Sequence, residues 1–275
     1  MLKEQVEYFS QNGIANNEDF FEFAKNFTNK LETGEIRSAW RDTDGTWKVN
    51  TWVKTGIHLL FQYGTMKDYS IDANFKFFDK NTLGPREMKL EDNIRLIPGG
   101  SAIRCGVFIG ERVICVPPMY INIGAYVDSG SMIDSHALIG TCAQIGKNVH
   151  ISAAAQIGGV LEPAGARPVI IEDDVMVGGN CGVYEGVLVR QGAVLGTGVI
   201  MNASTHIYDL VNERVIKSNG DIPLEVPEKA VVIPGSRALN TEFAKSFGLS
   251  ISTPIIIKYR DEKTNIKTAL NDLLR

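Results

Sequence analysis

The sequence of 275 residues has no apolar run approaching the roughly 18 residues that a membrane-spanning helix needs, so we expect no membrane partner. It also has no basic excess, because its net charge is −4, which argues against nucleic acid or an anionic membrane surface as the main partner. The polar, acidic N-terminal stretch has no charged segment followed by an apolar core, so we expect no signal peptide.

Cysteine is also scarce, and the four cysteines show no CxxC spacing. We therefore expect reduced, mostly buried thiols in a cytoplasmic protein, with neither a disulfide nor a bound metal. These cysteines are Cys105, Cys115, Cys142 and Cys181.

A six-residue repeat is what the sequence does contain. An aliphatic residue or Met recurs at every sixth position from Ile103 to Ile157, with Cys115 as the exception, and again from Ile171 to Ile207. Small residues such as Ala125 stand four positions after many of these residues. Turn formers follow directly after them, at Gly110, Asn122, Asp128, Asp134, Gly140, Gly146, Gly158, Gly178, Gly196 and Asn202.

This period predicts a parallel β-helix built from hexapeptides. It fits neither the period of about 3.6 residues of an α-helix nor the alternation of apolar and polar residues along an extended β-strand. Each aliphatic side chain would point into a narrow prism, and three hexads would make one coil of eighteen residues. We expect the Gly, Asn and Asp that follow the aliphatic residues to provide the backbone angles of the corners. Known hexapeptide families coil left-handed, so the fold class we predict is mainly β, with a left-handed parallel β-helix.

Three domains are expected. Residues 1–98 form a small α+β domain, in which residues 1–39 read as two helices, the second capped by Asn17. Asp44-Gly45 marks a hairpin turn, and the apolar segment 52–61 fits a strand or a helix. Residues 99–235 form the β-helix, and residues 236–275 form a C-terminal cap with a strand at 251–259 and a helix at 268–275.

One insertion interrupts the repeat, because fourteen residues separate Ile157 from Ile171. The segment about 159–169 is rich in Gly, Ala and Pro and must leave the stack at a corner. External loops of this kind usually carry a binding function, although a tolerated surface insertion is the simpler alternative.

Candidate catalytic side chains are few. A hexapeptide carbonic anhydrase needs three histidines that converge on zinc. Here His58 lies outside the repeat, and the other three histidines stand at different positions within the hexapeptide, which argues against such a site. Some hexapeptide acyltransferases use one histidine as general base, but an isolated His136, His150 or His206 is more often a packing or surface residue. Asp134 is a carboxylate candidate, although an Asp after the inward residue can serve only to shape the turn.

Several segments resemble the bacterial 2,3,4,5-tetrahydropyridine-2,6-dicarboxylate N-succinyltransferase family. Within the repeat they are MYINIGAYVDSGSMIDSHALIGTCAQIGKNVHIS (119–152) and IGGVLEP (157–163). Outside it they are DGTWKVNTWVK (44–54), FFDK (77–80), STHIYD (204–209) and LNDLLR (270–275). The resemblance implies a homotrimer that takes succinyl-CoA as co-substrate, binds no permanent cofactor and serves the succinylase route to diaminopimelate and lysine.

The resemblance also implies roles for particular residues. Asp134, in SMIDSH, would be the catalytic or substrate-contacting aspartate, and Arg95, in NIRLIP, would bind a substrate carboxylate, with Arg104 as a weaker candidate for that task. The arm of CoA would run along the β-helix under the external loop. We therefore expect the cofactor contacts to include Gly158, Gly159 and Ala166.

The sequence departs from the family pattern at two positions. Where members often carry a second catalytic Glu, this chain has Gly182, and Glu185 is the acid we expect to take part instead. His136 stands where a Trp is common. An N-acetyltransferase that uses acetyl-CoA and a non-catalytic β-helix scaffold are the alternative functions.

Overall fold

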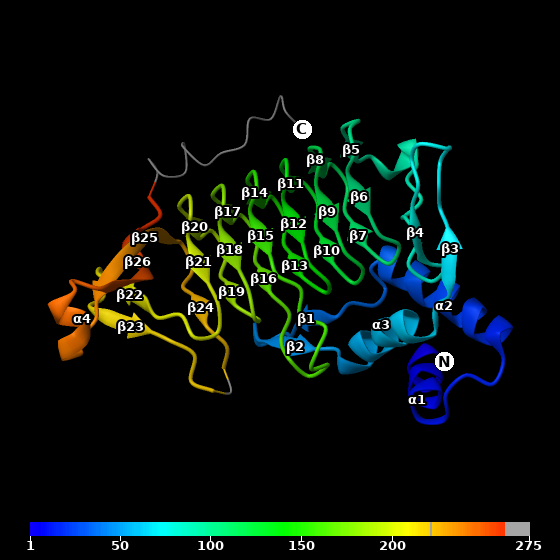
Figure 1. The fold of residues 1–275 in the computed structure, drawn as a ribbon, viewed down its shortest axis with the longest axis horizontal. Helices are drawn as coiled ribbons and strands as arrows, with labels where there is room; N and C mark the ends of the chain where they lie inside the picture. Colours follow the sequence, from blue (N-terminus) through cyan, green and yellow to red (C-terminus); the bar gives the residue numbers. More distant parts are fainter. Residues whose placement is uncertain (221, 262–275) are drawn as a thin grey trace.

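The computed structural model describes residues 1–220 and 222–261, and its main body is a coil of three parallel sheets (Figure 1). Each strand pairs with the strand one coil later, which is normally eighteen residues on, as in Tyr126 with Gln144. Every sixth residue is therefore an inward residue, and the rows of inward aliphatic side chains form one continuous buried core. The sequence predicted the parallel strands and the hexapeptide repeat correctly.

The strands of the coil are short. The first sheet contains β7 (Phe108–Ile109), β10 (Tyr126–Val127), β13 (Gln144–Ile145), β16 (Ile170–Ile171), β19 (Leu188–Val189) and β24 (Glu225–Val226). The second contains β6 (Ala102–Ile103), β9 (Tyr120–Ile121), β12 (Leu138–Ile139), β15 (Gln156–Ile157), β18 (Gly182–Val183) and β21 (Ile200–Met201). The third contains β5 (Arg95–Leu96), β8 (Ile114–Cys115), β11 (Met132–Ile133), β14 (His150–Ile151), β17 (Met176–Val177) and β20 (Val194–Leu195).

The corners of the coil correct one expectation. Positive φ angles occur three residues after the inward residue, as at Gly124 (φ 74°) and His136 (φ 61°), and not directly after it. The glycines directly after the inward residue are required for a different reason, namely the close approach of the next coil. A Cβ on Gly140 would lie 2.1 Å from the backbone nitrogen of Gly159.

The N-terminal region forms two long helices and a hairpin, as predicted. The helices are α1 (Leu2–Asn12) and α2 (Asn17–Glu32), and the hairpin strands are β1 (Ala39–Arg41) and β2 (Trp47–Val49). The cap of α2 is Asn16, not Asn17, because the Asn16 side chain accepts the N–H of Glu18. The ambiguous segment is a helix, α3 (Thr51–Tyr63), and it shares a second hydrophobic core with α1 and α2.

Shorter elements complete the N-terminal region. A hairpin of β3 (Met66–Asp68) and β4 (Phe78–Lys80) precedes the short 3₁₀ helix η1 (Leu90–Asp92). Figure 1 shows the N-terminal helices near the end of the coil that contains β5, and the C-terminal elements at the other end.

The C-terminal elements are four strands that extend the third sheet and one short helix. They are β22 (Ile207–Asp209), β23 (Arg214–Ile216), β25 (Ala230–Ala238), α4 (Glu242–Ser246) and β26 (Ser250–Tyr259). The strand predicted at 251–259 is therefore confirmed, whereas the helix predicted at 268–275 lies outside the described residues. The division into domains 1–98, 99–235 and 236–275 stays a proposal. Within the described residues, no helix is both long and apolar enough to cross a membrane.

Candidate functional site

The external loop follows β15 and rejoins the coil at β16, so the predicted insertion keeps the coil in register: Gln144 pairs with Ile170 and Ile145 with Ile171. A cavity of about 1190 Å³ lies against this loop. Its walls come from the loop, the hairpin strand β2, the corner after β18 and the segment that leads into β24.

Four of the residues predicted from the sequence line this cavity, namely Gly158, Gly159, Ala166 and Glu185. The two glycines begin the loop flush against the coil, because the backbone of Gly159 occupies the space beside Gly140. Glu185 lies at a corner with φ 53°, and its Oε2 accepts the backbone N–H of Ala203 at 3.0 Å. The Glu185 carboxylate is thus tied to the following coil while it borders the cavity.

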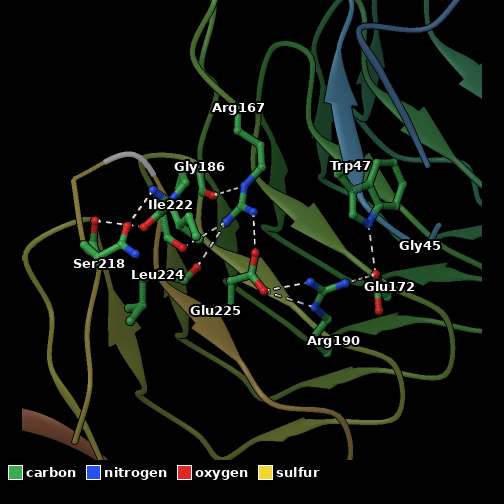
Figure 2. Close-up of polar contacts among 12 residues, drawn as sticks. Gly45, Trp47, Arg167, Glu172, Gly186, Arg190, Ser218, Ile222, Leu224 and Glu225 are labelled. Carbon is green, nitrogen blue, oxygen red and sulfur yellow. Dashed lines mark hydrogen bonds and ion pairs between the residues drawn. The ribbon is translucent and has the colours of Figure 1, made fainter. Parts of the chain in front are cut away.

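A network of charged side chains forms one wall of the cavity (Figure 2). Arg167 donates to a carboxylate oxygen of Glu225 at 2.6 Å and to the carbonyl oxygen of Gly186 at 2.9 Å. Arg190 donates to the other oxygen of Glu225 at 2.7 Å and lies 3.3 Å from Glu172. Burial opposes the charge of Glu225, but the hydrogen bonds from the two guanidinium groups outweigh burial and lower its pKa.

The hairpin is joined to this network through the indole of Trp47, which donates to Oε1 of Glu172 at 2.9 Å (Figure 2). Glu172 is 5% exposed and also accepts the backbone N–H of Gln191. A residue of the N-terminal hairpin is therefore held against the first sheet by a buried carboxylate. Sequence reasoning missed this network, although Glu172 and Arg190 are eighteen residues apart and therefore lie one coil apart. No spacing connects Trp47 to either of them.

Asp134 lies elsewhere, at the corner that follows β11, and not among the residues that line the cavity. Its Oδ1 accepts the N–H of Ser135 at 2.7 Å, which is the same contact that Asp128 makes with Ser129. Unlike Asp128, its other oxygen faces a histidine: Nε2 of His150 lies 3.7 Å from Oδ2 of Asp134. This distance is too long for a hydrogen bond but close enough for electrostatic attraction.

His150 is the functional candidate that sequence reasoning undervalued. Its Nε2 atom is buried and has no hydrogen-bond partner among the residues described. Burial lowers the pKa of the imidazole, and the Asp134 carboxylate offsets part of that effect. A neutral imidazole beside a carboxylate can accept or relay a proton near neutral pH.

The two predicted arginines have different environments. Arg95 lies on β5, in the same sheet as β11 and two strands away, a separation of about 10 Å between strands, and it is exposed. Arg104 donates to Asp79 at 2.6 Å and lies over the ring of Phe61. Neither arginine is among the residues that line the large cavity. The structure therefore separates a cavity group, namely Gly158, Gly159, Ala166 and Glu185, from an Asp134 group, namely Asp134 and Arg95. Arg104 belongs to neither group.

No group of three or more His, Cys, Asp or Glu residues in the part of the chain that is described could hold a metal ion. His136 is a corner residue whose backbone N–H donates to the carbonyl oxygen of Pro118. The thiols of Cys115 and Cys142 are buried, and burial raises the pKa of each to about 12. These thiols are therefore protonated at neutral pH and are poor nucleophiles.

Comparison with known proteins adds two family matches. Residues 7–63 match the model described as tetrahydrodipicolinate N-succinyltransferase N-terminal. Residues 168–203 match the model described as hexapeptide repeat of succinyl-transferase.

Curated relatives are similar over most of their length. A 2,3,4,5-tetrahydropyridine-2,6-dicarboxylate N-succinyltransferase of Nitrobacter winogradskyi is 42% identical, over 89% of this chain and 86% of the relative. The protein of the same name from a Wolbachia of Brugia malayi is 43% identical, over 89% of this chain and 85% of the relative. A solved Campylobacter jejuni structure, described as a putative 2,3,4,5-tetrahydropyridine-2-carboxylate N-succinyltransferase, has 14% identity and a TM-score of 0.48, with coverage of 86% of this chain and 62% of that chain.

Proposed function

We infer that this chain, which belongs to the tetrahydrodipicolinate N-succinyltransferase family, is a CoA-dependent acyltransferase of the succinylase route to diaminopimelate and lysine. It transfers the succinyl group of succinyl-CoA to the amine of tetrahydrodipicolinate, giving N-succinyl-2-amino-6-oxopimelate. The observation that carries this conclusion is identity above 40% with curated succinyltransferases over 89% of the chain.

The chemistry needs an unprotonated amine beside an activated carbonyl group. The amine nitrogen attacks the thioester carbon, a C–N bond forms and the C–S bond breaks, and the CoA thiolate leaves. The amine loses a proton to a base, and the leaving sulfur gains one. No covalent acyl-enzyme is required, because orientation alone accelerates the attack of an amine on a thioester, and no deprotonated cysteine is needed.

The acyl-CoA arm is proposed to occupy the large cavity beside the external loop. Gly158, Gly159 and Ala166 all border this space. The cavity volume of about 1190 Å³ suits an extended ligand. Glu185 borders the same space, where its carboxylate can accept a hydrogen bond from the co-substrate.

Asp134 is proposed to be the general base that removes the proton from the attacking amine. What supports this role is the difference from Asp128, since only Asp134 has a buried imidazole beside its free oxygen. Arg95 is proposed to hold a carboxylate of the dicarboxylate substrate. Arg104 is the weaker candidate, because its guanidinium is already paired with Asp79.

A homotrimer of left-handed β-helices is proposed to complete the site. The Asp134 group and the cavity group are separate within one chain, and a neighbouring copy would bring the Asp134 of one subunit to the acyl end of CoA held by another. The match to a hexapeptide repeat supports the left-handed coil, because known hexapeptide families coil in that hand. Location in the cytoplasm stays a prediction.

The test of the function is release of CoA in the presence of tetrahydrodipicolinate, with succinyl-CoA and acetyl-CoA compared side by side. We expect activity with succinyl-CoA. Preference for acetyl-CoA would select the N-acetyltransferase, and no release with either thioester would select the non-catalytic scaffold.

The test of the base is the pair Asp134→Asn and Asp128→Asn. Both changes retain an oxygen that can accept the N–H of the next residue, so they are structurally matched. We expect turnover to fall about a hundredfold or more in Asp134→Asn only. Equal turnover in the two variants would remove Asp134 from the role of base.

A further inference from the structure

Lys54, on α3, is buried and yet has no carboxylate partner. Its exposed fraction is 0%, and no Asp or Glu oxygen of the described residues lies within ion-pair distance of its Nζ. Instead, Nζ donates to the carbonyl oxygen of Ala166 at 2.7 Å and to that of Pro163 at 3.3 Å. Both carbonyl groups belong to the external loop that lines the large cavity.

A buried cation loses its hydration, which destabilises the folded state, and only the hydrogen bonds that it makes can offset this loss. We therefore ask what these hydrogen bonds do. Burial lowers the pKa of the ammonium group, and the thiol of Cys142 does not compensate the charge, because burial raises the pKa of that thiol to about 12. An apolar side chain of similar volume would pack in this place at lower cost. A lysine can donate hydrogen bonds to the two loop carbonyl oxygens, whereas a methionine cannot.

Two further contacts join α3 and its hydrophobic core to the same loop. One helical turn after Lys54, Nε2 of His58 lies 3.0 Å from Oε1 of Glu162. Leu161 packs against the hydrophobic core shared by the N-terminal helices. The His58 contact is exposed and therefore weak, so Lys54 makes the dominant polar contact.

The hydrogen bonds of Lys54 also orient two peptide groups. In a trans peptide the N–H is antiparallel to the C=O, so the N–H groups of Ala164 and Arg167 point away from the Lys54 ammonium. Neither N–H donates to a backbone or side-chain acceptor in the described part of the chain. Ala166 itself donates to the Pro163 carbonyl oxygen at 2.8 Å, which closes a turn within the loop.

We propose that Lys54 is a positioning residue that fixes the external loop in its acyl-CoA-binding form and leaves the N–H group of Arg167, a residue that lines the cavity, for an acceptor on the co-substrate. This inference rests on the proposed function as far as the co-substrate is concerned. The lysine contacts neither the thioester nor the amine, so it acts on binding and not on the chemical step.

The kinetic test compares Lys54→Met with the control Lys25→Met, which removes an exposed lysine from α2. In Lys54→Met we expect KM for succinyl-CoA to rise about tenfold to a hundredfold while kcat changes less than threefold. Lys54→Arg retains donors for the loop carbonyl groups and should recover part of the loss in KM. An unchanged KM in Lys54→Met, or a fall in kcat alone, would overturn the proposal.

The second test is amide hydrogen exchange of residues 158–167, which requires no activity. In the wild type the Ala166 amide should be protected without ligand, and Lys54→Met should increase exchange in this loop while the strands of the coil are unaffected. Rapid exchange of the Ala166 amide in the wild type would overturn the proposal even if the variant failed to fold. Protection of the loop together with inactivity towards every acyl-CoA would instead refute the proposed function and leave the anchoring intact.

Discussion

Gly182 stands where the family resemblance led us to expect an acid, and the structure gives a steric reason for glycine in this chain. A Cβ on Gly182 would lie 2.5 Å from Cε2 and 2.8 Å from the hydroxyl oxygen of Tyr184. The same ring lies over Gly158, whose Cβ would be 2.7 Å from Cδ1. The Tyr184 hydroxyl donates to Oε1 of Gln156 at 2.8 Å. The ring therefore covers the space that a side chain at position 182 would need.

The change Gly182→Ala should displace the Tyr184 ring or strain it. Displacement loses the hydrogen bond to Gln156, about 0.5–1.5 kcal/mol, and an unmoved ring would be overpacked at a cost of about 1–3 kcal/mol. Alanine gains about 0.5–1 kcal/mol over glycine in a strand. The net change is then between about 0.5 kcal/mol of stabilisation and 1 kcal/mol of destabilisation if the ring moves, and between about 0 and 2.5 kcal/mol of destabilisation if it does not. In a Tyr184→Ala background the same change should be neutral or stabilising.

The assay is urea unfolding of the wild type, the two single variants and the double variant at one protein concentration. The cost imposed by the Tyr184 ring predicts a coupling of about 0.5–3 kcal/mol between positions 182 and 184. Additive effects, within about 0.5 kcal/mol, would refute it. The same ring should also decide whether an acid can be introduced, so Gly182→Glu should fold stably only together with Tyr184→Ala.

Three further predictions follow from buried or crowded groups. Burial opposes the charge of Asp209, but hydrogen bonds from Asn212, Tyr259 and Arg214 hold its pKa at about 2 instead of 3.8, which corresponds to about 2.4 kcal/mol. Stability should therefore be lost as the pH falls through 4 to 2, and Asp209→Asn should flatten this acid limb in thermal unfolding. Burial lowers the pKa of His150 below 6.5, so the folded state resists protonation and stability should fall as the pH drops below about 6.5; an unchanged slope in His150→Gln would contradict this. A Cβ on Gly140 meets backbone at 2.1 Å, whereas one on Gly165 meets nothing within 4 Å, so Gly140→Ala should cost about 3 kcal/mol in urea unfolding and Gly165→Ala little.

The sequence predicted the coil well because one physical rule repeats along it. A strand of two residues buries one side chain, and the next coil places an equivalent side chain above it, so Ile121, Ile139 and Ile157 stack as their spacing requires. The corners were misread because glycine serves two purposes in this repeat. Gly124 provides a positive φ, whereas Gly140 provides space for the next coil, and composition alone does not separate the two.

The site was predictable only where it lies on the repeat or on the insertion. Gly158 and Gly159 begin the insertion that breaks the repeat, and Ala166 lies within it. Lys54, in contrast, looks like any lysine of a helix until its Nζ is found beside the carbonyl oxygen of Ala166, more than a hundred residues later in the chain. His150 has no distinguishing neighbour in sequence, because Asp134 reaches it from the preceding coil. Contacts between the N-terminal region and the coil have no signature in the spacing of the residues.

The contacts between the N-terminal region and the coil assign that region a role beyond covering an open end. Trp47 reaches Glu172, and Lys54 reaches the loop carbonyl groups, so consecutive parts of one short segment hold two different walls of the same cavity. Unfolding of α3 alone would therefore release the loop from Lys54 while the coil and the contact between Trp47 and Glu172 stay intact. With acyl-CoA in this cavity, as proposed, changes in the packing of the N-terminal region should alter KM for the co-substrate before they alter the stability of the coil.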